Sequence, residues 1–165
     1  MRKMLRLAAA LALLLLTTWP ALAQQRGELF YEDETGQLDR AAVERAAQPL
    51  RDRGYAVALY MTQDGSRADF NRRMDADNLK EPTGNNFLTY MVAIYVALDS
   101  RESYIQAGDD FNAALATRLG EQTNGEIIRT TKLNPGLSSG DYTKGFVDAL
   151  GAIDLAVANP PDPTG

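Results

Sequence analysis

The stretch that decides the fold is Asn86–Gly108, NFLTYMVAIYVALDSRESYIQAG. Its apolar run, Tyr90–Leu98, is short, rich in β-branched and aromatic residues and bounded by polar ones, which is typical of a strand buried on both faces. The turn residues Asp99–Glu102 follow, and Ser103–Ala107 alternates between polar and apolar residues like a returning strand. The centre of the chain is therefore predicted to be a β-hairpin with helices packed over it.

The segments before the hairpin predict a helix, a strand and a second helix. Asp39 is expected to cap a helix with an apolar stripe from Val43 to Leu50. Tyr55–Met61 is predicted to be another buried strand, and Arg67–Leu79 a weaker helix. A strand, a helical crossover and a further strand in this order predict a parallel pair.

After the hairpin, Asp109 or Asp110 is expected to cap a helix, and a final helix is expected to begin near Ser138–Asp141. The β-branched segment Glu126–Leu133 is predicted to be a short edge strand ended by Asn134-Pro135-Gly136. These elements predict one α/β domain. Its fold class is a three-layer α/β/α sandwich, Rossmann-like, with a small mixed sheet and a central β-hairpin.

The first 23 residues have the three parts of a secretory signal peptide. A basic start precedes the apolar core Leu7–Leu16, which is shorter than the roughly 20 residues that span a bilayer. Ala21-Leu22-Ala23 is a small-residue cleavage site. We therefore predict an exported chain, periplasmic or extracellular, with a domain at residues 24–158, a Pro-rich tail at residues 159–165 and no transmembrane anchor after cleavage.

Charge and composition restrict the chemistry further. Removal of the signal peptide leaves 14 basic and 22 acidic residues, a net charge of −8. This charge disfavours nucleic acid and anionic membranes as partners and favours cations and basic protein surfaces. The chain has no Cys and no His, which excludes Ser-His-Asp triads, Cys nucleophiles and ordinary zinc sites. Any metal ion would be a hard cation held by oxygen atoms.

Acidic residues stand where the predicted strands end and where helices begin. Asp64 and Asp99 each follow a buried strand, so their carboxylates are expected at the carboxyl edge of the sheet, where open α/β sheets bind ligands. With Asp33, Asp109 and Asp110 they are the candidate metal ligands, and a set of oxygen ligands suits calcium. The alternative is structural: Asp64 and Asp99 are turn residues, and Asp109 and Asp110 are helix caps.

The Asp75-Ala76-Asp77 motif does not support a second metal site. A phosphotransfer Asp-x-Asp needs a strand that ends at its first Asp, whereas this motif lies in a polar stretch predicted to be helical. An EF-hand loop would need an oxygen ligand and a glycine where Leu79 and Lys80 stand. We interpret the motif as the solvated face of a helix.

Four segments follow one another in an order and spacing that can be compared with known families. They are the acidic turn Asp33–Leu38, the loop with Asn85-Asn86, the hairpin end ALDSRESYIQAG at Ala97–Gly108, and the helix that follows GLSSGDYTKG at Gly136–Gly145. In order and spacing the chain resembles the TPM domain family, the extracytoplasmic group that includes the thylakoid lumen protein of photosystem II repair. The resemblance covers residues 30–158. The aromatic-Gly-x-Gly signature usual in that family is missing from MDADNLKEPTGNNF, residues 74–87.

The resemblance implies a Rossmann-like domain held in the periplasm, the lumen or at the outer face of a membrane. It implies a protein partner in the envelope or at the membrane surface, a role as a binding, assembly or repair module, and calcium as a ligand. The alternative function is a weak metal-dependent acid phosphatase that acts at Asp64 and Asp99. In such an enzyme a bound cation would have to polarise the phosphate and activate water.

Overall fold

The computed structural model describes residues 25–81, 86–119 and 125–158, so the predicted signal peptide and Pro-rich tail lie outside the described residues. Four strands form one sheet in the order β1-β2-β3-β4. The strands are β1 (Leu29–Asp33), β2 (Ala56–Thr62), β3 (Met91–Ala97) and β4 (Glu102–Ala107). β1, β2 and β3 are parallel, and β4 pairs antiparallel with β3 as the predicted hairpin.

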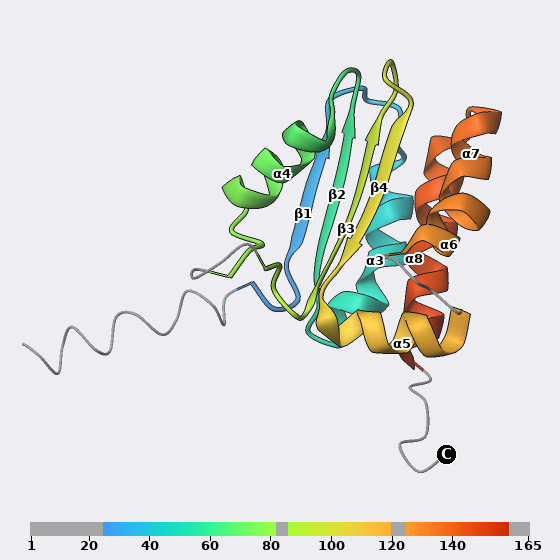
Figure 1. The fold of residues 1–165 in the computed structure, drawn as a ribbon. Coiled ribbons are helices and arrows are strands. Elements are labelled where there is room, and N and C mark those ends of the chain that lie inside the picture. The colour runs from blue at the N-terminus through green and yellow to red at the C-terminus, as the bar shows by residue number, and fades with distance from the viewer. Residues whose placement is uncertain (1–24, 82–85, 120–124, 159–165) are drawn as a thin grey trace, which may run out of the picture.

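Helices cover both faces of this sheet (Figure 1). On one face lie α3 (Arg40–Asp52), α7 (Asn134–Ser139) and α8 (Tyr142–Ala158), and on the other lies α4 (Arg67–Ala76). α5 (Asp109–Leu119) crosses the end of the sheet that is opposite to the hairpin turn. The predicted three-layer α/β/α sandwich with a small mixed sheet is therefore confirmed.

The central strand is buried on both faces, as its continuous apolar run predicts. All seven residues of β3 are buried. Val92, Ile94 and Val96 pack in the core beneath α3 and α8, whereas Ala93 and Tyr95 pack in a second core beneath α4. Because strand side chains alternate between faces, one strand thus contributes to both cores.

The two crossover helices leave the sheet in opposite directions. The strand order advances from β1 to β2 to β3, yet α3 and α4 lie on opposite faces. The chain therefore diverges after the carboxyl ends of β1 and β2, and the two crossovers have opposite hands. Asp33 and Asp64 follow the two strands after which the chain diverges, and open α/β sheets commonly bind ligands beyond the carboxyl ends of their strands.

The predicted edge strand at Glu126–Leu133 is wrong. The segment forms a helical turn, α6 (Glu126–Ile128), and then a π-helix, η1 (Arg129–Leu133). Ile128 and Leu133, five residues apart, are both buried in the core under α8, and a spacing of five matches the hydrogen-bond step of a π-helix. Tertiary packing therefore overrides the strand preference of the β-branched residues.

Asn134-Pro135-Gly136, which was predicted to end the edge strand, forms the start of α7 instead. Proline is accepted in the first helical turn because its missing N–H has no partner there. Gly136 lies against Gly145 of α8, and a Cβ on Gly136 would stand 2.5 Å from the Cα of Gly145. This close approach holds α7 against α8 and places Leu137 and Ser138 opposite the end of the hairpin.

Candidate functional site

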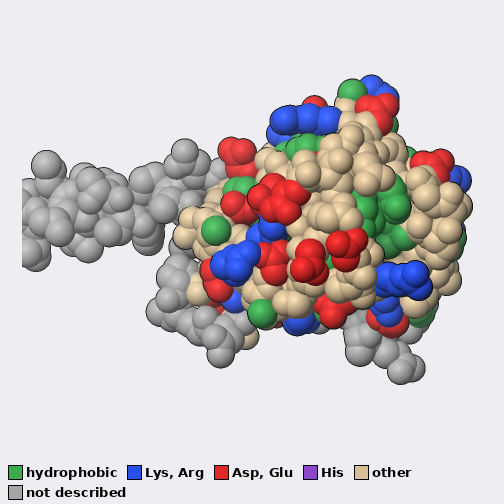
Figure 2. Space-filling view, turned by 90° about the horizontal axis from the view of Figure 1, so that it is seen from above, with side chains coloured by type: hydrophobic (Ala, Val, Ile, Leu, Met, Phe, Trp, Pro, Cys, Tyr) green, Lys and Arg blue, Asp and Glu red, His purple; other side chains and the backbone are tan. Residues whose placement is uncertain are grey.

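The carboxyl ends of the parallel strands bring together three of the predicted site residues. Asp33 ends β1, Asp64 lies two residues beyond the end of β2, and Asp99 lies in the turn after β3. Viewed from this edge, Asp and Glu side chains gather on the surface with Lys and Arg side chains beside them (Figure 2). The sheet topology therefore confirms the shared edge predicted for Asp64 and Asp99, and it places Asp33, whose position the sequence left open, at the same edge.

Asp33 is held by its own loop. Its carboxylate accepts hydrogen bonds from Thr35 N (2.9 Å), Thr35 Oγ1 (2.7 Å), Gly36 N (3.0 Å) and Leu38 N (2.9 Å). Burial disfavours the charged form, but these hydrogen bonds outweigh it and lower the pKa of the Asp33 carboxyl. Its oxygens therefore stabilise the turn that leads to α3.

Asp64 and Asp99 are exposed and lie on adjacent loops. Asp99 Oδ1 accepts a hydrogen bond from Gln63 Nε2 at 2.5 Å, and Asp99 N donates to Gln63 O at 2.8 Å. Ser100 Oγ donates to Gly65 O at 2.8 Å, and Gly65 N donates to Asp64 Oδ1 at 2.8 Å. These bonds join the hairpin turn to the loop after β2 and hold the two aspartates on one surface.

Asp109 and Asp110 are far from this edge. They begin α5, which follows the antiparallel strand β4 and therefore lies at the opposite end of the sheet (Figure 1). Asp109 Oδ1 accepts a hydrogen bond from Asn112 Nδ2 at 3.4 Å. Within the described residues, no group of three or more acidic side chains is arranged to hold a metal ion. The predicted ligand set is thus divided between two ends of the sheet.

A network of charges lies between β1 and α4. The Arg73 guanidinium pairs with Glu32 (2.5 Å), Glu34 (2.6 Å) and Asp69 (2.9 Å), and its side chain is only 11% exposed. Tyr95 Oη donates to Asp69 Oδ2 at 2.8 Å. Burial disfavours ionisation of Asp69, but the hydrogen bonds from Arg73 and Tyr95 outweigh it and lower its pKa. The network joins α4 to two strands.

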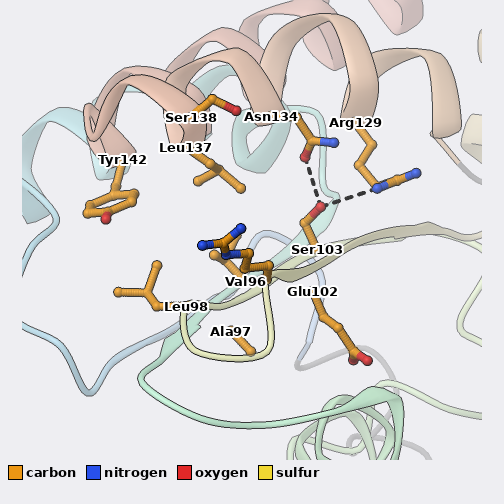
Figure 3. Close-up of a pocket in the computed structure, with 11 residues that line it drawn as sticks. Val96, Ala97, Leu98, Glu102, Ser103, Arg129, Asn134, Leu137, Ser138 and Tyr142 are labelled. Atoms are coloured by element: carbon orange, nitrogen blue, oxygen red, sulfur yellow. Dashed lines mark hydrogen bonds between the residues drawn. The ribbon is translucent and has the colours of Figure 1, made fainter.

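The hairpin and the helical layer enclose a pocket of about 570 Å³ (Figure 3). One wall comes from the end of β3, the turn and the start of β4, and the other from η1, α7 and the start of α8. Its lining residues are Val96, Ala97, Leu98, Arg101, Glu102, Ser103, Arg129, Asn134, Leu137, Ser138 and Tyr142. The volume is within the range of small-molecule sites, roughly 300 to 1,000 Å³.

The inner wall of the pocket is polar and ordered by hydrogen bonds. Ser103 Oγ donates to Asn134 Oδ1 at 2.8 Å and accepts from Arg129 Nη1 at 3.4 Å (Figure 3). Arg129 also pairs with Glu126, and these hydrogen bonds raise the pKa of the guanidinium and lower that of the carboxyl. The π-helix thus directs Arg129 and its neighbour Asn134 towards the hairpin, and π-helical turns are frequent at functional sites.

The sequence interpretation missed this pocket because it made Glu126–Leu133 a strand. One signal was available: Ile128, Leu133 and Leu137 are spaced at five and four residues, which fits one face of an irregular helix better than a strand. The polar residues Arg129 and Asn134 follow two of these apolar residues directly.

Comparison with known proteins supports the fold and leaves the activity open. No protein family matches the chain, and no curated protein matches it. Among the described residues, no helix combines the length and apolar character needed to cross a membrane.

Three solved bacterial domains share the fold. The N-terminal domain of a P. gingivalis protein is 18% identical, with a TM-score of 0.58, and the match covers 82% of this chain and 85% of that one. The BA42 protein of Bizionia argentinensis is 20% identical, with a TM-score of 0.51 and coverage of 73% and 81%. The N-terminal domain of the cg2496 protein of Corynebacterium glutamicum is 12% identical, with a TM-score of 0.50 and coverage of 76% and 78%. At these identities the likeness establishes a common architecture.

Proposed function

We propose that this protein is an exported binding module that binds a partner protein in the cell envelope. We further propose that calcium binds to its acidic surface and modulates the charge there. The observation that supports the proposal is the gathering of Asp33, Asp64 and Asp99 at the carboxyl edge of the sheet, where the chain diverges after β1 and β2. The resemblance to the TPM family suggests the setting and the ion. The acidic charge favours a partner with a basic surface.

The residues at this edge fit a weak and partly hydrated calcium site. Asp64 and Asp99 are exposed carboxylates on linked loops, whereas Asp33 already accepts four hydrogen bonds. Calcium takes 6–8 oxygen ligands, and water and backbone carbonyls commonly supply part of the set. Two carboxylates without a closed cage match the affinity of extracellular calcium modules, about 10⁻⁴ to 10⁻³ M.

Calcium is expected to raise the melting temperature of the purified protein. Binding only to the folded state stabilises it by about 1.4 kcal/mol when the ion is at ten times its dissociation constant and by about 2.7 kcal/mol at a hundred times, which is a rise of a few degrees for a domain of this size. The measurement is thermal unfolding in about 10 mM calcium, which is about ten to a hundred times the expected dissociation constant, and in magnesium at matched ionic strength. Magnesium should act more weakly because it dehydrates reluctantly and requires strict octahedral geometry.

Substitutions test whether the effect belongs to the proposed residues. Asp64→Asn and Asp99→Asn should each remove the calcium-selective rise, whereas Asp110→Asn, at the other end of the sheet, should retain it. Equal effects of calcium and magnesium would mean that the acidic loops are only turns and caps. An assay with a generic phosphoester, run in parallel, tests the enzymatic alternative. If the wild type hydrolyses the phosphoester in the presence of metal ions and both Asp64→Asn and Asp99→Asn lose this activity, the protein is a phosphatase and the binding-module proposal is wrong.

A further inference from the structure

The pocket between the hairpin and α7 has walls of two different kinds. Leu98, Leu137 and Tyr142 contribute apolar surface, and Figure 3 shows them grouped at one end of the pocket. Ser103 and Asn134 form the polar end, where their mutual hydrogen bond fixes both side chains. A ligand that fits this pocket needs an apolar body and a polar group.

The charges around the pocket favour a ligand with one negative charge. Arg129 is already balanced, because its Nε and Nη2 contact the two carboxylate oxygens of Glu126 at 2.9 and 2.5 Å. Glu102 points away from the helical wall in Figure 3, and its Oε2 accepts the Tyr104 hydroxyl at 2.6 Å. Arg101 also lines the pocket, and none of the described residues forms an ion pair with it.

The backbone at Arg101 gives an independent reason to assign it a role. Arg101 has φ +55° and closes the hairpin turn, with its N–H donating to Leu98 O at 3.2 Å. Glycine or asparagine usually occupies such a left-handed position, since a larger side chain is strained there. A residue that departs from such a local conformational preference without a structural gain is often found at a functional position.

We propose that this pocket binds a small organic monocarboxylate with an apolar body. The Arg101 guanidinium pairs with the carboxylate, the Ser103–Asn134 pair supplies neutral hydrogen bonds, and the apolar body lies against Leu98, Leu137 and Tyr142. Among the described residues, Arg101 is the lining arginine without an ion pair, and Glu102 adds a negative charge to the lining, so a monoanionic carboxylate fits better than a phosphate dianion. This site shares the hairpin turn with the proposed calcium surface but uses different side chains, and its test needs no calcium.

Hexanoate is a suitable probe for this site. Titration of the purified protein should produce saturable NMR shifts in the amide signals of Ser103, Arg129 and Asn134. Hexan-1-ol keeps the apolar body without the charge, and inorganic phosphate keeps charge without the apolar body, so both should bind more weakly. The absence of saturable shifts with hexanoate, or equal or tighter binding of either comparison compound, would overturn the proposal.

Arg101→Gly separates the ligand contact from the fold. Glycine relieves the left-handed conformation, so the variant should melt no lower than the wild type, yet it should bind hexanoate about tenfold more weakly, as expected for the loss of a charge-assisted hydrogen bond. Arg101→Asn, which also tolerates this conformation, should show the same loss.

Arg101→Gly both relieves a left-handed backbone conformation and removes an arginine, and one control variant reproduces each of these two effects elsewhere. Asn78→Gly relieves the other left-handed non-glycine residue among those described, at φ +53°, and Arg45→Ala removes an exposed arginine outside the pocket. Both should bind hexanoate like the wild type. Unchanged affinity in Arg101→Gly and Arg101→Asn would overturn the assignment, as would an equal loss in either control.

Discussion

Ile94→Asp is expected to leave no soluble, folded protein. Ile94 is 0% exposed at the centre of β3, and it lies in register with Leu59 of β2 and Ile105 of β4. Its neighbours in the core are apolar, so the new carboxylate would have no partner. Burying an unpaired carboxylate costs several kcal/mol or forces its protonation, which is comparable with the total stability of a domain, about 5–15 kcal/mol.

Two substitutions control for position and for chemistry. Ile94→Val keeps the site apolar and should cost about 1 kcal/mol. Leu155→Asp introduces the same charge at a side chain that is 67% exposed, so it should remain soluble. Soluble yield and the melting curve by circular dichroism are the measurements, and Val92→Asp should behave like Ile94→Asp. Normal yield and melting of the two β3 variants would mean that this strand is not the buried centre.

The pattern of the sequence predicts β3 and the hairpin well because burial on both faces needs a continuous apolar run. In the same way, Asp39 caps α3 as predicted, with its Oδ1 accepting the Ala42 N–H at 3.0 Å. These features are determined by residues close together in the sequence, and each has a single clear environment: full burial for β3 and a helix N-terminus for Asp39. A local pattern is informative when no distant contact opposes it.

The segment 126–139 could not be predicted in this way because distant contacts decide its structure. Its β-branched residues favour a strand locally, yet Ile128 and Leu133 are buried under α8, and Gly136 fits against Gly145. Thr130 and Thr131 return hydrogen bonds to the carbonyls of the preceding turn, which satisfies them inside a helix. The pocket depends on this segment, so it was missed with it.

The candidate metal ligands show how topology limits a prediction from spacing. The rule that parallel strands end at one edge correctly placed Asp64 and Asp99 together. The same hairpin that the sequence predicted carries the chain back to the other end of the sheet, where Asp109 and Asp110 begin α5. The number of strand reversals between two residues therefore decides whether they can share a site.

Arg73→Met is expected to destabilise the protein by about 3 kcal/mol at neutral pH. The substitution removes the cation between Glu32, Glu34 and Asp69 and leaves these carboxylates close together. Breaking a buried ion pair typically costs about 3–5 kcal/mol. The lower end applies because the side chains of Glu32 and Glu34 are 50% and 44% exposed, and solvent screens them. Urea unfolding measures the change in free energy.

The pH dependence distinguishes this electrostatic loss from a packing defect. Hydrogen bonds from Arg73 and Thr62 lower the pKa of Glu34, and those from Arg73 and Tyr95 lower that of Asp69 against the effect of burial. A carboxyl with a lowered folded-state pKa contributes stability above its unfolded pKa, about 4, and loses it as the pH falls through the folded-state pKa. Arg73→Met lacks this contribution, so its stability should approach that of the wild type in acid.

Two further variants test whether the carboxylates cause the loss. Asp69→Asn in the Arg73→Met background removes the most buried of the three charges, with 11% of its side chain exposed, and should recover part of the lost stability. Arg73→Lys keeps the charge without the planar fork of donors and should fall between the wild type and Arg73→Met. A difference between wild type and Arg73→Met that stays constant from pH 7 to about pH 3 would show that Arg73 acts through packing of its stem, because only the ionised carboxylates require its charge.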